Sequence, residues 1–182
     1  MKKLIIAMVI VILTILGIAV ICYLNDHGKN ISSGIQVAAN FAIAVTLIVT
    51  VLTYLDKQRI EKHHKTFDLL DKYDSPDMRQ ARNLSREIKK DCKNISSNQL
   101  LEKINTTPKL EESIILLYNY FTKVRYAIEI GIVDKEVVMK ELGETMIDIM
   151  ERFIPWAESS DKSNGFIKDS KEMLKDFKKW TN

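Results

Sequence analysis

Two long runs of residues without a charge dominate the first third of the chain. The first extends from Leu4 to Leu24 and the second from Ile31 to Leu55. As a helix, 21 residues are roughly 31 Å long, which matches the hydrocarbon thickness of a bilayer. We therefore predict a transmembrane hairpin over residues 1–55, with spans at about residues 4–24 and 34–55 and an external loop at about residues 25–33.

The first run has an alternative interpretation as a secretory signal. A signal peptide has an apolar region of about 7–15 residues that ends in small residues at a cleavage site. The run is longer here and ends in the bulky sequence Ile21-Cys22-Tyr23-Leu24. We interpret it as an uncleaved anchor, and removal of the segment by processing is the alternative.

Basic residues flank the two runs unevenly. Lys2 and Lys3 precede the first run, and several more follow the second: Lys57, Arg59, Lys62 and Lys65. Because basic residues favour the cytoplasmic side of a membrane, both termini are expected in the cytoplasm. The sequence thus predicts a multi-pass protein of the inner cell membrane.

The second run carries a stripe of small or hydroxyl-bearing residues at steps of four, namely Ala38, Ala42, Thr46 and Thr50. Such a stripe lets helix backbones approach closely in lipid. It either packs against the first span or forms the seam of a homo-oligomer or the lining of a pore. Asn40, in the same span, prefers a hydrogen-bond partner to lipid.

Residues 56–182 contain 24 Lys and Arg against 23 Asp and Glu, a balance typical of a globular surface. Apolar residues recur there at the helical period, and no segment alternates over any length. The predicted fold class is all-α, with the hairpin followed by a cytoplasmic helical bundle of about five helices.

Start and stop signals place the helices of this bundle. The second span is expected to continue toward Tyr73. The further expected helices are Pro76 to about residue 93 after Ser75, a short helix from a Ser97 cap to Ile104, Thr107-Pro108 to Gly131, Asp134 to Pro155, and a last helix after a loop at Ser159–Gly165. Pro155 is expected to kink or end its helix because proline lacks a backbone donor.

Several segments of the bundle carry a resemblance through their order and spacing. They are Asp74–Arg82, Tyr120-Phe121, Gly131–Asp134, Leu142-Gly143 and Phe153–Pro155. In these segments the chain resembles an uncharacterised family of small bacterial proteins, many of them membrane-anchored. The resemblance covers roughly residues 66–180. It implies one helical domain of unknown function and carries over no catalytic residues.

The helix expected after Pro76 has an apolar, a basic and an acidic or polar sector. The basic sector holds Arg79, Arg82, Arg86, Lys89, Lys90 and Lys93. These side chains, along about 20 Å of helix, are suited to a phosphate-rich ligand such as a nucleotide or short oligonucleotide. The alternatives are a solvated face paired with acids or close to anionic lipid, and a contact with a partner protein.

Few residues point to a reaction. His63 and His64 are adjacent, whereas zinc ligands on one helix are three or four residues apart. The stacked acids Glu144, Asp148 and Glu151 lack matching ligands from a second helix. Gly-rich phosphate loops and Ser-His-Asp sets are absent from the sequence. We therefore expect no enzymatic activity, no metal and no cofactor.

These observations favour a non-enzymatic membrane sensor or effector. Its cytoplasmic domain would receive a signal, and its spans would respond by oligomerising. By analogy with small two-span effectors, a role in anti-phage defence is the working hypothesis. The alternative is a membrane-tethered adaptor that recruits a cytosolic protein partner. An enzyme built from scattered acids is the third hypothesis.

Overall fold

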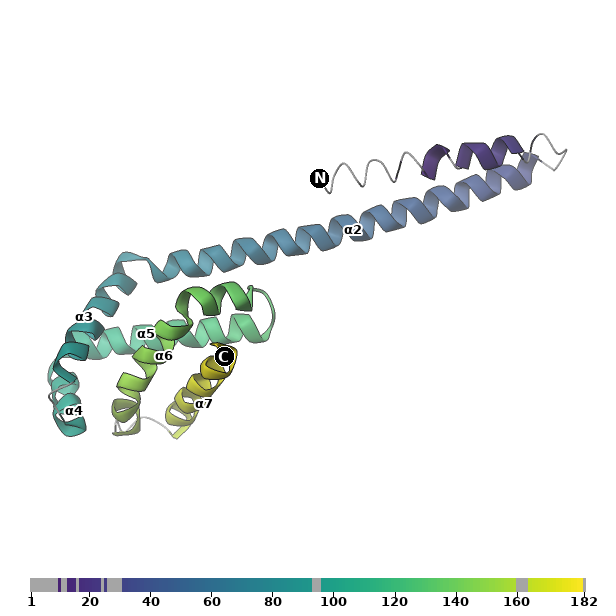
Figure 1. Ribbon diagram of the computed structural model, residues 1–182. Helices are drawn as coiled ribbons and strands as arrows, with labels where there is room; N and C mark the ends of the chain where they lie inside the picture. The colour runs from purple at the N-terminus through teal and green to yellow at the C-terminus, as the bar shows by residue number, and fades with distance from the viewer. Residues whose placement is uncertain are drawn as a thin grey trace. The chain divides into compact units, whose positions relative to one another are not determined.

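The computed structural model describes residue 10 and residues 13–15, 17–23, 25, 31–92, 96–159 and 164–181. Within these ranges the regular elements are helices and no strand occurs, so the prediction of an all-α fold is confirmed. The helices are α2 (Ile31–Tyr73), α3 (Pro76–Cys92), α4 (Ser97–Thr106), α5 (Pro108–Glu129), α6 (Lys135–Ser159) and α7 (Asn164–Thr181) (Figure 1).

The chain forms two compact units, Met1–Ile60 and Glu61–Asn182. The boundary between them falls inside α2, so this helix contributes its apolar part to the first unit and its last turns to the second. We refer to the second unit as the helical domain. The predicted continuation of the second apolar run as far as Tyr73 is confirmed.

In the first unit, α2 provides the helix that is long and apolar enough to cross a membrane. This property belongs to the part that begins at Ile35, and none of its most apolar stretch is buried. The first predicted span corresponds to helical residues 13–15 and 17–23, a shorter apolar segment, and residues 4–9 lie outside the described ranges. One membrane-length helix is therefore established among the described residues, and the two-span hairpin stays a prediction.

The helical domain is built around α5. Four of its side chains, at steps of three and four residues, have no exposed surface: Ile114, Leu117, Phe121 and Val124. This spacing turns one face of the helix inward. The α3 helix packs against α5, and α7 packs mainly against α6.

Aromatic rings fill the centre of the domain. Phe121 of α5 meets Phe177 of α7 edge to face, with ring centroids 6.4 Å apart. Phe153 and Trp156 of α6 are also fully buried. Aromatic side chains bury large areas and pair with directional geometry, so these contacts fix how the helices lie against one another.

Helix ends follow their local chemistry. Gly131 has φ +73°, a left-handed conformation that favours glycine, and it stops α5 as predicted. The Asp134 carboxylate accepts hydrogen bonds from the backbone N–H groups of Glu136 and Val137, so the predicted cap of α6 is confirmed.

One predicted helix end is wrong, and the prediction for a second allows two outcomes. The cap of α4 is Ser96 and not Ser97, because the Ser96 side chain accepts from the Gln99 N–H while the Gln99 side chain accepts from the Ser96 N–H. Sequence reasoning overlooked that Gln99 completes this reciprocal pair with Ser96. For Pro155, which is expected to kink or end its helix, an end is excluded, because α6 continues to Ser159.

The end of α7 approaches α6 closely at Gly143. A Cβ atom at this position would lie 2.8 Å from the Thr181 hydroxyl oxygen and 3.0 Å from the Met139 terminal methyl. Both distances are shorter than ordinary van der Waals contact, so the side chain at 143 is limited to hydrogen unless its neighbours move.

Hydrogen bonds attach the last turns of α2 to the helical domain. The buried Thr66 hydroxyl accepts from the Asp134 N–H at 2.8 Å and donates to the Lys62 carbonyl at 2.8 Å. The Tyr120 hydroxyl of α5 donates to the Leu69 carbonyl at 2.8 Å. These bonds join α2 to the α5–α6 connection and to the middle of α5.

Replacing Thr66 by valine keeps the side-chain shape but leaves the Asp134 N–H without its acceptor. Because Thr66 is only 1% exposed, we expect the free energy of unfolding to fall by about 1–3 kcal/mol. Trp156 and Trp180 both lie in the helical domain, so tryptophan fluorescence during urea unfolding in detergent micelles measures this change. The control is Thr122→Val on the exposed face of α5, with an expected change within about 0.5 kcal/mol.

Candidate functional site

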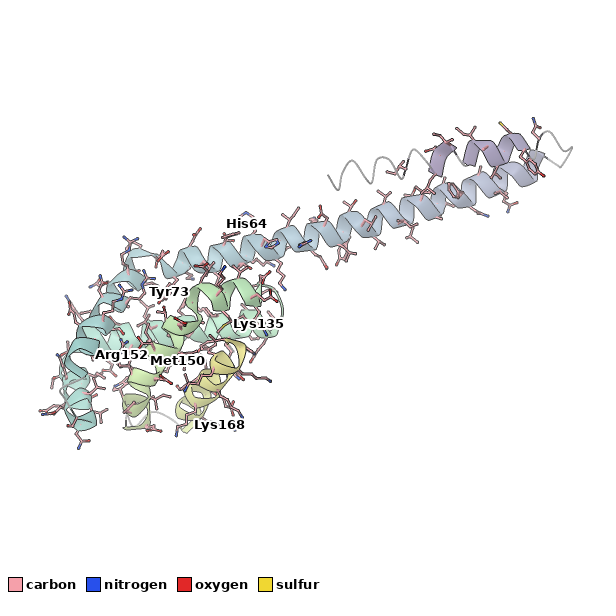
Figure 2. The ribbon with its side chains drawn as sticks, viewed as in Figure 1. His64, Tyr73, Lys135, Met150, Arg152 and Lys168 are labelled. Atoms are coloured by element: carbon pink, nitrogen blue, oxygen red, sulfur yellow. The ribbon has the colours of Figure 1, made fainter. Side chains whose placement is uncertain are left out.

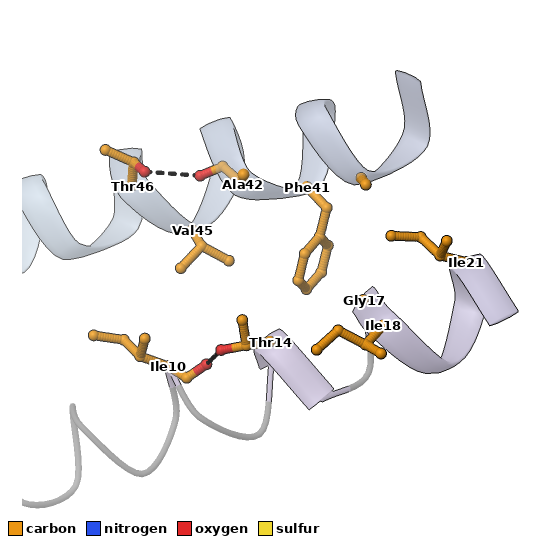
Figure 3. A pocket seen from close by; sticks show the side chains of 10 residues that line it. Ile10, Thr14, Gly17, Ile18, Ile21, Phe41, Ala42, Val45 and Thr46 are labelled. Atoms are coloured by element: carbon orange, nitrogen blue, oxygen red, sulfur yellow. Dashed lines mark hydrogen bonds between the residues drawn. The ribbon is translucent and has the colours of Figure 1, made fainter. Parts of the chain in front are cut away.

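An apolar groove of about 290 Å³ lies in the first unit, between the N-terminal helical residues and α2. Its lining residues are Ile10, Thr14, Gly17, Ile18, Ile21, Ala38, Phe41, Ala42, Val45 and Thr46. Figure 3 shows Phe41 and Val45 pointing from α2 toward Thr14 and Ile18. A Cβ at Gly17 would lie 3.6 Å from the Phe41 ring, an ordinary van der Waals distance, so the two helices are in contact here without excluding a small side chain.

The described threonine hydroxyls of this unit donate within their own helix. Thr14 donates to the Ile10 carbonyl, and Thr46 donates to the Ala42 carbonyl at 2.8 Å. Thr50 donates to the Thr46 carbonyl in the same way. Such bonds satisfy hydroxyl donors where no water is present. The groove is therefore suited to an apolar neighbour rather than to an ion.

Three of the five predicted packing residues line this groove: Ala38, Ala42 and Thr46. Asn40 and Thr50 are exposed on α2 and are not among the lining residues. The stripe of small residues thus faces the N-terminal segment over part of its length. Whether it also meets a second copy stays a prediction.

The predicted basic residues lie along α3 in the helical domain. Arg79 and Arg86 are exposed, whereas the side chain of Arg82 is only 12% exposed. Lys89 and Lys90 belong to α3, but their side chains lie outside the described part, as does Lys93 altogether. Their role as an anion site stays a prediction.

Two of these arginines converge where α2 ends and α3 begins, which we call the α2–α3 corner (residues 73–82). Arg82 Nη2 lies 2.9 Å from Asp74 Oδ1, and its guanidinium carbon lies 4.1 Å from the centre of the Tyr73 ring. Arg79 Nη2 donates to the Asp74 carbonyl at 3.2 Å. Cations placed at the carbonyl end of a helix are stabilised by its dipole, so both arginines also support the end of α2.

Tyrosines form the buried side of the corner. The rings of Tyr73 and Tyr120 stack with centroids 5.4 Å apart. Burial raises the pKa of Tyr73, and the positive charge of Arg82 opposes that rise. Burial also raises the pKa of Tyr120. Both phenols therefore stay neutral at physiological pH, and Tyr120 keeps the proton that it donates to Leu69.

Sequence reasoning missed the role of Arg152, a second arginine that fastens α3. Its side chain is 7% exposed, and Nη1 donates to the Ser85 carbonyl at 2.8 Å and to the Ser85 hydroxyl at 2.6 Å. Nη2 pairs with Asp148. The i,i+4 spacing of Asp148 and Arg152 was a signal for half of this contact, whereas nothing in the sequence indicated Ser85.

Other charged residues of the helical domain pair between helices. Arg125 binds Glu129 at 2.9 Å and also reaches Asp176 of α7 at 2.8 Å. Glu151, one of the stacked acids of α6, pairs with Lys178 at 2.5 Å. Among the described residues, no group of three or more His, Cys, Asp and Glu side chains is placed to hold a metal ion.

These features define an all-helical domain that shares one helix with an exposed apolar segment. The chain belongs to the family of a domain of unknown function, DUF4760, which it matches over residues 40–176. No curated protein and no solved structure gives a significant match. The resemblance to an uncharacterised family is confirmed, but its expected start near residue 66 is too late, because the match begins within the apolar part of α2.

Stability is expected to fall at alkaline pH because of the buried phenols. A tyrosine in the unfolded chain ionises near pH 10, whereas Tyr73, Tyr118 and Tyr120 keep their protons to higher pH in the folded state. Their raised pKa values contribute stability below about pH 10 that is lost as the pH rises further. The measurement is the urea midpoint at pH 8, 9, 10 and 11 in detergent micelles.

Tyr120→Phe separates the two roles of this side chain. At pH 8 it should lose about 1 kcal/mol with the bond to Leu69. Above pH 10 its stability should fall less steeply than that of the wild type, because one phenol no longer ionises on unfolding. An equally steep decline would contradict the assignment of the alkaline effect to Tyr120.

Proposed function

We propose that the protein is a non-enzymatic, membrane-anchored sensor or effector. The observation that carries this proposal is α2, a single helix whose first part is apolar and exposed and whose last turns are bound into a helical domain. A signal received by the domain would act on the membrane segment through this shared helix.

The apolar part of α2 supports a membrane location. Ile43 and Leu47 are 67% and 65% exposed, and many other large apolar side chains of the helix are similarly exposed. Exposed apolar surface in water costs about 25 cal/mol per Å², and monomeric soluble proteins rarely leave such a large patch uncovered. A bilayer removes this cost. The family match, which includes residues 40–60, indicates that the apolar helix belongs to the domain that defines the family.

The two-span topology is the finer part of the proposal. Residues 4–24 would form the first span, packed on α2 through the groove at Gly17 and Ala38. Lys2 and Lys3 at one end and the basic residues after Leu55 at the other would keep both termini in the cytoplasm. The helical domain would then face the cytoplasm.

Signal reception is assigned to the basic face of α3. Its arginines supply planar donor groups that match phosphate, so the proposed signal is an anionic nucleotide or a short oligonucleotide. The response would be oligomerisation of the spans, with a role in anti-phage defence. That role rests on analogy with other small two-span effectors.

The membrane proposal predicts resistance to extraction and a defined topology. The protein should remain in the membrane fraction after washing with alkaline carbonate. In a Cys22→Ala, Cys92→Ala background, a cysteine introduced as Asp26→Cys should react with an impermeant maleimide in intact cells. A cysteine introduced as Lys140→Cys in the helical domain should react only after lysis. Extraction by carbonate, or labelling of both positions in intact cells, contradicts the proposal.

An adaptor that recruits a cytosolic protein is the second candidate. It is favoured by the exposed apolar side chains Ile115 and Leu116 on α5, which are 36% and 39% exposed. We take this pair as the centre of the contact that an adaptor would make with its partner. The adaptor needs the membrane segment only as a tether.

Replacing residues 1–55 by an unrelated two-span anchor distinguishes the two candidates. An effector should lose its effect on membrane potential in cells that express it at high level, because its own spans cause that effect. An adaptor should keep its cellular phenotype with either anchor. The effector proposal is contradicted if cells that express the unaltered protein keep their membrane potential and the protein is monomeric in detergent.

A further inference from the structure

The α2–α3 corner holds an acid in the place where an anionic ligand would bind. Arg82 is enclosed on one side by the Tyr73 ring and is paired with Asp74 at 2.9 Å. The Asp74 side chain is 70% exposed, whereas that of Arg82 is 12% exposed. Figure 2 shows Tyr73 at the end of α2 where the chain turns into α3. The acid is thus the outer and more accessible member of the pair.

The ion pair leaves much of the binding capacity of the arginines unused. Arg82 donates to Asp74 through Nη2, and its buried Nε has no hydrogen-bond partner among the described residues. A guanidinium has five donors arranged to bind an oxyanion through two parallel hydrogen bonds. An exposed carboxylate held through one nitrogen is a weak competitor, since pairs of this kind contribute little in water.

Neighbouring arginines extend the same surface. Arg79 precedes Arg82 by three residues and Arg86 follows it by four, so all three lie on one side of α3. Arg79 also contacts Asp74, through its backbone carbonyl at 3.2 Å. A multiply charged anion at the position of the Asp74 carboxylate would therefore meet more than one guanidinium.

We propose that a phosphate-bearing anion binds the α2–α3 corner by displacing the Asp74 carboxylate from Arg82, and that this displacement loosens the end of α2. Asp74 acts as a built-in competitor that keeps the site closed until the ligand arrives. The inference rests on the proposed function, because it locates the proposed sensing step at particular atoms.

The hydrogen bonds of the corner also explain how ligand binding would affect the end of α2. The turn after Tyr73 is closed by hydrogen bonds from the Asp74 N–H to the Asp71 carbonyl at 3.0 Å and from the Ser75 N–H to the Lys72 carbonyl at 3.2 Å. Asp74 therefore belongs both to this turn and to the ion pair. Pulling its side chain away from Arg82 should weaken the turn and increase amide exchange at Asp74 and Ser75.

The test uses the full chain in detergent micelles with inorganic pyrophosphate as the probe. Asp74→Asn removes the competing charge and keeps the side-chain shape, so pyrophosphate should bind about two- to fivefold more tightly. The matched control is Asp77→Asn, which removes an exposed acid of α3 for which no contact with Arg82 is seen. The gain in pyrophosphate affinity caused by Asp77→Asn should be less than half of the gain caused by Asp74→Asn. Equal gains in the two variants would reveal a general charge effect and overturn the proposal.

Arg82 provides the second arm. Arg82→Gln should abolish saturable binding, with folding verified by tryptophan fluorescence. Arg82→Lys keeps the charge but loses the planar fork, and it should weaken binding severalfold even if the glutamine variant does not fold. Unchanged affinity in the lysine variant would overturn the proposal. It would also be overturned if pyrophosphate bound neither the wild type nor Asp74→Asn and the lipid experiment described next were negative as well.

Hydrogen exchange distinguishes a soluble phosphate from a lipid headgroup. Exchange at Asp74 and Ser75 should increase with pyrophosphate in micelles if the ligand is soluble. If it increases only in phosphatidylcholine nanodiscs that contain phosphatidic acid, the phosphate belongs to a lipid, and the corner site is still supported. No increase in either setting overturns the site. Resistance to carbonate extraction does not depend on this result, so failure of the site is distinguishable from failure of the membrane proposal.

Discussion

The hydroxyl groups of Thr66 and Tyr120 meet backbone groups of neighbouring segments and thereby determine where α2 is held in the helical domain. The Thr66 hydroxyl accepts a hydrogen bond from the Asp134 N–H, just before α6, and the Tyr120 hydroxyl donates to the Leu69 carbonyl. Both contacts are specific in direction, unlike apolar packing, which tolerates sliding. With Tyr73 buried beyond them, the last turns of α2 have one register relative to the core. The position of Tyr73, where the α2–α3 corner begins, follows from this register.

The two parts of α2 obey different physical rules. The apolar part keeps its hydrogen bonds within the helix, including those of Thr46 and Thr50, and buries none of its most apolar stretch. The last turns gain stability from side-chain contacts with other helices. A helix with these two characters is consistent with passage from a medium without water to an aqueous domain surface. Membership of the family, with a match that begins at residue 40, ties the two characters to one domain.

Periodicity and end signals predicted most of the helical domain correctly. The stripe on α5, the stop at Gly131 and the cap at Asp134 are local features that depend on few neighbours. The wrong cap of α4 has a local cause as well. Ser96 and Ser97 both qualify as caps, and Gln99, three residues after Ser96, completes a capping box that favours Ser96. At Pro155, packing of Phe153 and Trp156 into the core outweighs the loss of one backbone donor.

The candidate site was less predictable from the sequence. Helical spacing grouped Arg79, Arg82 and Arg86 correctly on one side of α3, but it treated them as equivalent. Only the fold reveals that Arg82 is enclosed by Tyr73 while Arg79 and Arg86 stay exposed. Contacts between residues far apart in sequence, such as Arg152 with Ser85, have no local signature. The family match begins within the apolar part of α2 and includes the arginines of α3, but it assigns no function to them.

The buried Arg152 limits how α3 can move. Because it holds Ser85 near the middle of the helix, sliding α3 along its axis would break both hydrogen bonds between Ser85 and a buried cation, which is a costly change. A disturbance at the Asp74 end is therefore expected to tilt the helix about Ser85 rather than to slide it. The opposite end, which carries Lys89 and Lys90, would then move in the opposite direction.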